Sequence, residues 1–183
     1  MHTFTCDKGC CSVKIDMSMR DPKGPLRRNY RKAGVFIYDP KENRVLLVQS
    51  RGQLWGPPKG TLELGENETE CAVREVKEET GLDIIPSNFS RATKIKNRAM
   101  YFYLEMNMCP VSIQKDIDDN DANGITWIKI DCLRECVYNG HIVLNQHCKT
   151  VFSRFMDITF PKSGFVRVEV KRRKKINKNK NEK

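Results

Sequence analysis

Short runs of aliphatic, aromatic and β-branched residues recur along the chain, separated by turn-forming residues. Residues 33–38 (AGVFIY) and 44–49 (RVLLVQ) flank the turn-rich stretch DPKEN, so they predict two consecutive strands. Residues 125–130 (ITWIKI) alternate with a period of two, which is typical of a half-buried strand. The remaining strand predictions are residues 84–85 and a hairpin of residues 91–96 and 99–106 that turns at Asn97 and Arg98.

Two other segments show the spacing of amphipathic helices. Residues 68–80 follow Asn67, which can cap the helix together with Glu70, and they end before Gly81, a residue suited to the left-handed conformation past a helix end. Residues 141–156 carry apolar side chains at helical spacing and predict a second helix. Together these elements predict an α/β fold, an α/β/α sandwich with a mixed β-sheet between helices.

The first predicted helix carries an acidic face. Glu75, Glu78 and Glu79 lie at positions i, i+3 and i+4, so their carboxylates converge on one side of the helix. Like charges at this spacing destabilise a helix, and a hard divalent cation among the oxygens would offset their repulsion. A solvated acidic face is the alternative interpretation. The apolar stripe expected to pack on the sheet consists of Ala72, Val73 and Val76.

The stretch GTLELGENETECAVREVKEETGL, residues 60–82, resembles the Nudix box: a glycine, five residues, a glutamate, seven residues, then R-E-U-x-E-E-x-G-U with U aliphatic. The resemblance implies a Nudix-type fold whose loop, helix and loop bind Mg²⁺ or Mn²⁺. It also implies hydrolysis of a diphosphate bond in a nucleoside diphosphate linked to another group. The matching positions are Gly60, Glu66, Arg74, Glu75, Val76, Glu78, Glu79, Gly81 and Leu82.

Other residues of this motif have predicted structural roles. Arg74 can reach back to Glu66, and the ion pair would brace the loop that enters the helix, although direct metal contact by Glu66 is an alternative. Gly60 permits a close backbone approach and leaves its carbonyl available to the metal. Gly81 ends the helix.

The loop LWGPPKG and the helix CAVREVKEETGLDI are similar to the catalytic domains of mRNA-decapping Nudix enzymes. Related WxPPKG stretches also occur in Nudix hydrolases of dinucleoside polyphosphates, so the loop does not separate the two groups. Lys59 is the candidate phosphate contact, and Arg51, at the start of the longer loop RGQLWGPPKG, is a further candidate for substrate binding. Trp55, Tyr101 or Phe102 is a candidate for stacking on a base, with core packing as the alternative.

Many decapping enzymes use a later acidic residue, just before a strand that contains a tryptophan. Here Asp118, Asp119 and Asp121 precede Trp127, and Asp121 is the candidate metal ligand or general base. Glu78 is the other candidate for the base, and the sequence leaves the choice open. A polar loop is the alternative reading of these aspartates.

Length and composition are those of one ordinary globular domain. The chain has 183 residues, of which 39% are hydrophobic, and no apolar run reaches the roughly 20 residues of a membrane-spanning helix. The N-terminus lacks the pattern of a signal peptide, so we expect a cytoplasmic location and no membrane contact. The predicted domain covers residues 33–170. Only 32 residues precede it, too few for the helical regulatory domain that cellular decapping enzymes carry.

Positive charge is concentrated at the two ends. Residues 1–32, predicted to be a basic extension, carry about +5, and residues 171–183 carry about +7 of the total of +10. The C-terminal stretch has almost no apolar residues, which predicts a disordered tail. Both ends are candidates for contact with RNA, and the tail could also direct the protein to the nucleus. A solubilising role for the tail is the alternative.

The eight cysteines are scattered rather than paired in CxxC units. Free thiols in a reducing compartment are the simplest interpretation. Cys6, Cys10 and Cys11, with His2 nearby, could hold a zinc ion, although their spacing matches no standard zinc site.

Three functions remain open at this stage. The first is hydrolysis of the mRNA 5′ cap to release m7GDP. The second is hydrolysis of a dinucleoside polyphosphate, a nucleotide or a diphosphoinositol polyphosphate. The third is a non-catalytic RNA-binding module, which the intact set of motif glutamates argues against. The oligomeric state is not predicted.

Overall fold

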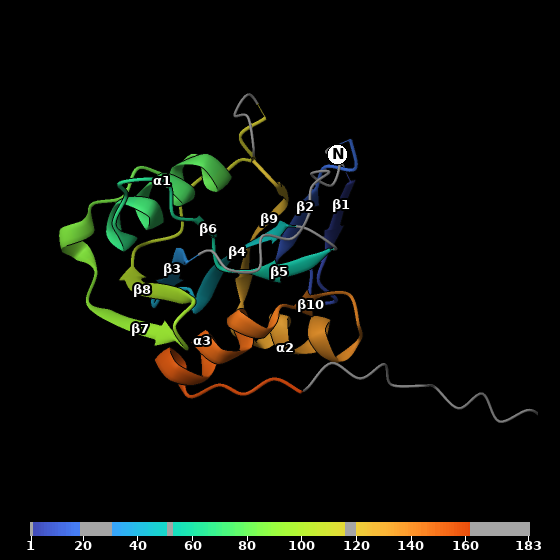
Figure 1. The fold of residues 1–183 in the computed structure, drawn as a ribbon. Helices are drawn as coiled ribbons and strands as arrows, with labels where there is room; N and C mark the ends of the chain where they lie inside the picture. Colours follow the sequence, from blue (N-terminus) through green and yellow to red (C-terminus); the bar gives the residue numbers. More distant parts are fainter. Residues whose placement is uncertain (1, 19–30, 51–52, 116–119, 162–183) are drawn as a thin grey trace, which may run out of the picture.

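The computed structural model describes residues 2–18, 31–50, 53–115 and 120–161 of the chain. Within these residues the strands form one ten-stranded sheet (Figure 1), whose main path is β1-β2-β9-β4-β3-β8-β7, with β5, β6 and β10 off this path. The strands are β1 (His2–Thr5), β2 (Ser12–Ile15), β3 (Lys32–Asp39), β4 (Arg44–Ser50), β5 (Leu54–Gly56), β6 (Lys59–Thr61), β7 (Arg91–Ile95), β8 (Ala99–Glu105), β9 (Ala122–Lys129) and β10 (Val143–Leu144).

The sheet is mixed, as predicted. β3 pairs in parallel with β8 and antiparallel with β4 and β6. The strands predicted at residues 33–38, 44–49 and 125–130 are confirmed as β3, β4 and β9, and the predicted hairpin is confirmed as β7 and β8. Because β3 contacts three other strands, it holds β6, which precedes the first helix, at the middle of the sheet.

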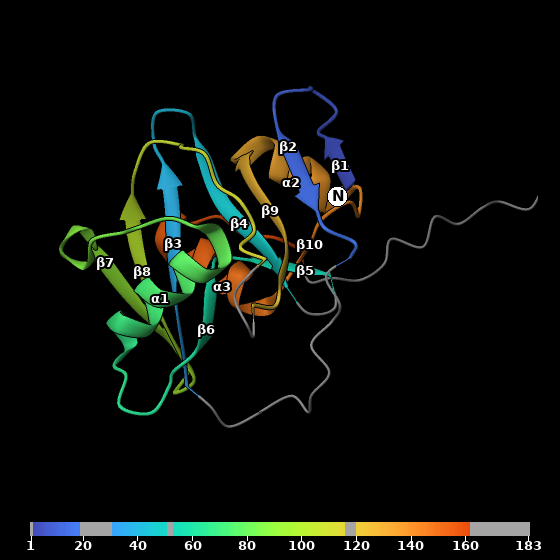
Figure 2. The ribbon, with the colours of Figure 1, turned by 90° about the horizontal axis from the view of Figure 1, so that it is seen from above.

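Helices cover both faces of the sheet. Figures 1 and 2 show α1 (Glu68–Thr80) on one face and α2 (Ile130–Tyr138) with α3 (Gln146–Met156) on the other. A short 3₁₀ helix, η1 (Pro86–Asn88), follows α1. The predicted sandwich of a mixed sheet between helices is therefore the observed fold.

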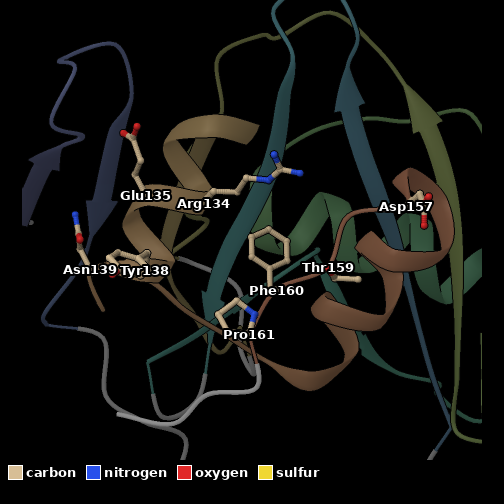
Figure 3. Close-up of a pocket in the computed structure, with 8 residues that line it drawn as sticks. All are labelled: Arg134, Glu135, Tyr138, Asn139, Asp157, Thr159, Phe160 and Pro161. Atoms are coloured by element: carbon tan, nitrogen blue, oxygen red, sulfur yellow. The ribbon is translucent and has the colours of Figure 1, made fainter. Parts of the chain in front are cut away.

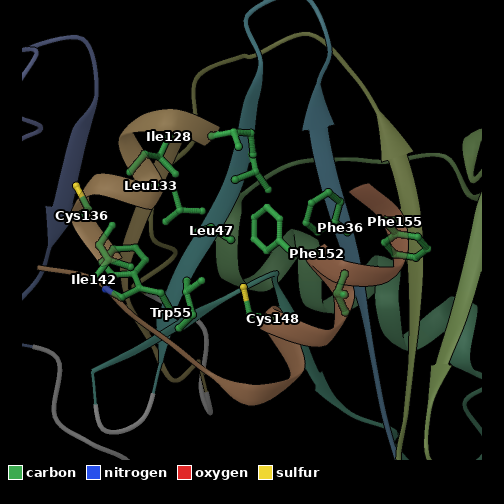
Figure 4. Close-up of a cluster of buried hydrophobic side chains, with 14 of the residues drawn as sticks. Phe36, Leu47, Trp55, Ile128, Leu133, Cys136, Ile142, Cys148, Phe152 and Phe155 are labelled. Carbon is green, nitrogen blue, oxygen red and sulfur yellow. The ribbon is translucent and has the colours of Figure 1, made fainter. Parts of the chain in front are cut away.

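The strands alternate between two hydrophobic cores because successive side chains of a strand point to opposite faces. On β3, Phe36 belongs to the core under α2 and α3, while Val35 and Ile37 belong to the core under α1. On β4, Leu47 belongs to the core under α2 and α3, and Leu46 belongs to the core under α1. Figure 4 shows the core under α2 and α3, where side chains from both helices meet those of the central strands. The central strands are therefore buried on both faces, which explains their near-continuous apolar sequence.

Two secondary-structure predictions are wrong. Residues 84–85 form no strand, and Ile85 is exposed. The helix predicted over residues 141–156 begins only at Gln146, because Val143 and Leu144 instead form β10, which pairs in parallel with β5. Leu144 is buried in this way without being helical.

The first residues of the segment predicted as a basic extension belong to the sheet. β1 and β2 form an antiparallel hairpin, and β2 pairs with β9 through Lys14 and Ile125. Val13 is fully buried in the core under α2. Residues 19–30 of the predicted basic extension and the predicted tail of residues 171–183 lie outside the described residues.

None of the helices that the structure describes is long and apolar enough to cross a membrane.

Candidate active site around helix α1

The ends of α1 are fixed by its own sequence. The Asn67 side chain accepts hydrogen bonds from the backbone N–H groups of Thr69 and Glu70 at 2.9 and 3.0 Å, and the Glu70 carboxylate accepts one from the Asn67 N–H at 2.9 Å. This is the predicted capping box. At the other end Gly81 has φ = 78°, and its N–H donates to the Lys77 carbonyl at 2.8 Å. The helix therefore starts and stops where the motif requires.

The rotation of α1 against the sheet differs from the prediction. Its buried residues include Cys71, Ala72 and Val76, whereas Val73 is only partly buried. Glu79 is also buried, with 2% of its surface exposed, because it lies on the helix face that is turned to the sheet. The three glutamates thus occupy different depths rather than one exposed face.

Arg74 is the positive centre of the site. Its guanidinium donates two hydrogen bonds to Glu66, from Nε at 2.8 Å and from Nη2 at 3.0 Å, so the predicted contact between these residues is present. Nη1 also donates to Glu75 at 3.0 Å and to Glu78 at 2.9 Å. The hydrogen bonds and charge of Arg74 hold the pKa of Glu66 below its ordinary value despite burial. One cation thus orders three carboxylates.

The negative charge of Glu79 is compensated by fewer hydrogen bonds than that of Glu66, which binds Arg74. Its Oε2 accepts a hydrogen bond from the Lys59 backbone N–H at 2.8 Å, but the buried Oε1 has no donor among the described residues. Burial raises the pKa of Glu79 well above its ordinary value, and the charges of Glu75 and Asp121 raise it further. Burial likewise raises the pKa of Glu75 to about 7. A buried carboxylate oxygen without a donor fits a bound cation.

The position of Glu75 leaves room only for a glycine at residue 60. A Cβ atom at residue 60 would collide with the Glu75 carboxylate group. Gly60 lies in β6, where it pairs with Ala33 of β3. The close backbone approach predicted for this glycine is therefore an approach to Glu75. Metal contact by its carbonyl stays a prediction.

Asp121 lies beside these carboxylates. It precedes β9, and its charge contributes to raising the pKa of both Glu75 and Glu79. The adjacent Asn120 ties this segment to the end of α1, because its Nδ2 donates to the Glu78 carbonyl at 2.8 Å. The alternatives Asp118 and Asp119 lie outside the described residues.

Lys59 lies beside the carboxylates, on the side of β6. The positive charge of Lys59 opposes the pKa rise of Glu79 that burial causes. Lys32, one residue from the Ala33 that pairs with Gly60, donates from Nζ to the Thr61 hydroxyl at 3.1 Å. The site therefore combines an acidic centre with an adjacent cation, Lys59, which suits a substrate carrying phosphates.

His147 of α3 lies within the electrostatic reach of Lys59 and Lys32, a neighbourhood that the sequence did not indicate. Burial lowers its pKa, and the charges of Lys59 and Lys32 lower it further, so both lysines act on this imidazole. Its Nδ1 lies 3.2 Å from the Tyr101 hydroxyl. No motif surrounds this histidine in the sequence. Only the fold brings α3 near the two lysines.

The stacking residues predicted from the sequence are not available as open surfaces. Trp55 is 1% exposed and Tyr101 is fully buried, and both belong to the core under α2 and α3. The prediction that they contact the substrate is wrong, because neither ring presents a face to solvent, and both have the alternative role of core packing. Phe102 is partly buried and stacks on Phe89, with ring centroids 4.8 Å apart. Arg51 lies outside the described residues.

A pocket elsewhere on the protein is separate from this site. Figure 3 shows it between α2 and residues 157–161, lined by residues that include Arg134, Tyr138 and Phe160. It lies on the face of the sheet opposite α1, so it does not adjoin the carboxylates.

Residues 28–147 match the family model of the NUDIX domain. The 111R protein of Invertebrate iridescent virus 3 is 34% identical over 140 residues, which cover 72% of this chain and 80% of that protein. The m7GpppN-mRNA hydrolase dcap-2 of Caenorhabditis elegans is 33% identical over 111 residues, which cover 55% of this chain but only 14% of dcap-2. The asymmetrical bis(5′-nucleosyl)-tetraphosphatase of Rattus norvegicus is 31% identical over 97 residues, covering 47% and 64% of the two chains.

Among solved structures, the bifunctional NMN adenylyltransferase/ADP ribose pyrophosphatase of Francisella tularensis, in complex with AMP and a manganese ion, matches with a TM-score of 0.50. The sequence identity is 15%, and the match covers 74% of this chain and 43% of that one. This likeness is one of fold.

The raised pKa of Glu75 predicts a pH effect on stability. With a pKa of about 7 in the folded state and about 4.5 when unfolded, the folded protein retains a proton that the unfolded chain releases between these values. Glu75 therefore makes folding less favourable as the pH rises from about 5 to about 7. In chelator-treated protein, Glu75→Gln should reduce the fall in melting temperature over this range. Parallel curves for variant and wild type would contradict the assignment.

Proposed function

The chain belongs to the Nudix family of pyrophosphohydrolases, and on that premise we propose that it hydrolyses the 5′ cap of RNA and releases m7GDP. Cleavage of a diphosphate bond is the reaction class of the family. The capped substrate and the roles of individual residues are the parts that we propose.

The observation that carries the proposal is the carboxylate cluster of Glu75, Glu78 and Glu79 with Asp121 beside it. These hard oxygen donors suit Mg²⁺ or Mn²⁺, and one buried oxygen, Oε1 of Glu79, accepts no hydrogen bond from any residue that the structure describes. We assign the metal to Glu75, Glu78, Glu79 and the Gly60 carbonyl. When bound, such an ion lowers the pKa of a water and polarises a phosphoryl oxygen.

Within this site, Glu78 is proposed to take the proton of the attacking water. Its side chain is 29% exposed, against 12% for Glu75, so it is the more accessible of these two carboxylates. Arg74 holds it in place through Nη1 at 2.9 Å. Asp121 is the alternative proton acceptor, since it lies beside the same cluster.

Lys59 is proposed to bind the phosphates of the substrate. Its backbone N–H positions Glu79, and its charge acts on both Glu79 and His147. A cation at this place can oppose the negative charge that develops on the leaving diphosphate.

Capped RNA is favoured as the substrate by two observations. The loop LWGPPKG and the helix that follows it resemble those of decapping enzymes, and a relative of this region is the m7GpppN-mRNA hydrolase of Caenorhabditis elegans. The basic ends of the chain supply charge for an RNA backbone beyond the cap. An RNA that continues past the cap would contact both the active site and the basic ends of the chain.

A dinucleoside polyphosphate is the second candidate substrate. It is favoured by the similarity to the bis(5′-nucleosyl)-tetraphosphatase of Rattus norvegicus. Both substrates contain a polyphosphate between two nucleosides, so the carboxylates and lysines would act in the same way. What differs is the length of RNA beyond the cap.

Product analysis tests the proposal. Purified protein with Mg²⁺ or Mn²⁺ is expected to release m7GDP from cap-labelled RNA and to act much more slowly on a cap dinucleotide or a dinucleoside tetraphosphate. Deletion of residues 171–183 should weaken activity on RNA and leave activity on dinucleotides unchanged, because only RNA reaches beyond the site. Equal activity on RNA and dinucleotides, unaffected by the deletion, would contradict the decapping proposal.

Glu78→Gln is expected to lower kcat by about a thousandfold, the order expected when a proton acceptor is lost. Gln keeps the shape of the side chain while removing its charge, so the melting temperature should change little. Glu68→Gln, at the start of the same helix and away from the carboxylate cluster, is the matched control and should keep near-normal activity. Near-normal turnover in Glu78→Gln would contradict the assignment.

Lys59→Met is expected to lower kcat/KM by about a hundredfold, because it removes a cation that opposes charge on the leaving diphosphate. The backbone N–H that binds Glu79 remains in this variant. Lys41→Met, in the exposed turn between β3 and β4, serves as the control. Initial rates over a range of substrate concentrations would decide, and equal values for both variants would exclude the assigned role.

A further inference from the structure

Four cysteine side chains meet at the opposite side of the fold from α1. The Sγ atoms of Cys6, Cys10, Cys11 and Cys132 all lie within 4.8 Å of one another. The first three come from the β1–β2 hairpin, and Cys132 comes from the first turn of α2, more than 120 residues later. Three of these cysteines lie close together in the sequence, and the fold adds Cys132 as the fourth candidate ligand.

The three distances from the Cys10 sulfur to the other sulfurs fit a tetrahedral metal site. Cys10 Sγ lies 3.7 Å from Cys6 Sγ, 3.7 Å from Cys11 Sγ and 3.5 Å from Cys132 Sγ. Four thiolates that bind zinc at about 2.3 Å stand about 3.8 Å apart along the edges of the tetrahedron. A disulfide requires about 2.05 Å and would use only two of the four sulfurs.

The loop between β1 and β2 is shaped to bring its cysteines together. The Cys6 N–H donates to the Cys11 carbonyl at 3.0 Å, and the Gly9 N–H donates to the Cys6 carbonyl at 2.8 Å. Gly9 has φ = 68°, a conformation that favours glycine, and so closes the turn. Both ends of the loop are thereby fixed relative to the sulfurs.

Groups around the cluster suit thiolates rather than thiols. The Lys129 backbone N–H points to Cys11 Sγ at 3.3 Å, and Arg44 Nη1 lies 3.5 Å from the same atom. Donors of this kind are the outer partners that commonly surround metal-bound sulfur. Cys6, Cys11 and Cys132 are buried and Cys10 is exposed, so the cluster is shielded but still open to an entering ion.

We propose that Cys6, Cys10, Cys11 and Cys132 bind one zinc ion as four thiolates and thereby fasten the β1–β2 hairpin to α2. Each thiol that binds releases its proton, and the resulting charge of −2 lies beside the Arg44 guanidinium. All four ligand positions are taken by protein, so the site is structural rather than catalytic. His2, considered from the sequence as a ligand, is not a member of the group.

The zinc content of full-length protein, purified with a reductant and zinc and then desalted, tests the proposal. Wild type should hold about one zinc per chain by elemental mass spectrometry, and Cys132→Ser should lose most of it. Cys136→Ser is the matched control, because Cys136 is buried on the same helix one turn later but lies outside the group. Glu78→Gln should also retain the zinc, which separates this site from the carboxylates.

Cobalt provides a second readout that does not depend on a variant folding. Co²⁺ added to metal-free wild type should give the sulfur-to-metal charge-transfer band and the strong visible bands of tetrahedral thiolate coordination, and zinc should abolish them. Carboxylates at the other site give no such charge-transfer band. Removing zinc should lower the melting temperature of wild type and leave that of Cys132→Ser unchanged.

Three results would overturn the proposal. These are wild-type protein without zinc and without a cobalt–thiolate spectrum, equal zinc in wild type and Cys132→Ser, or a Cys10–Cys132 disulfide in protein isolated with its thiols blocked at lysis.

Discussion

The burial of Glu79 beneath α1 is the constraint on which the arrangement of the active site depends. The helix turns this carboxylate toward the sheet, where the Lys59 backbone binds one oxygen and no described residue donates to the other. Glu75 then lies so close to Gly60 that no side chain fits there. Arg74 stabilises Glu66, Glu75 and Glu78 but does not hydrogen-bond to Glu79. The protein thus gathers carboxylates whose charged forms are only partly compensated, which is an environment prepared for a cation.

What the sequence could predict was mostly local. The cap at Asn67, the end of α1 at Gly81 and the pair of Arg74 with Glu66 each depend on residues at most eight positions apart. The depth of Glu79 was not predictable, because helical spacing alone does not say how a helix is rotated against a sheet. His147 and Asn120 come from distant segments, and no motif marks either of them. Lys59 could be predicted, because it lies directly before Gly60 in the sequence.

The missed elements have a similar cause. The nine residues of α2 follow β9 without an intervening turn signal, so the strand pattern concealed the start of the helix. Residues 143–144 are spaced as in a helix but pair with β5 instead, which buries Leu144 and leaves Val143 exposed. Cys132 also belongs to α2, so the failure to predict this helix concealed the fourth cysteine. His2, which is close to three of these cysteines in the sequence, is not part of the cluster, whereas Cys132 from the distant helix α2 is.

The outer strands of the sheet bear on how copies of this protein can associate. An open edge invites another chain to add a strand, and proteins limit this with short edge strands and with charged side chains. β1 has only four residues, and β7, at the opposite edge, exposes Arg91 and Lys94. Neither border offers the long, flat and apolar strand that promotes edge-to-edge aggregation. Self-association of this fold would therefore proceed more readily through helices or loops than by continuing the sheet.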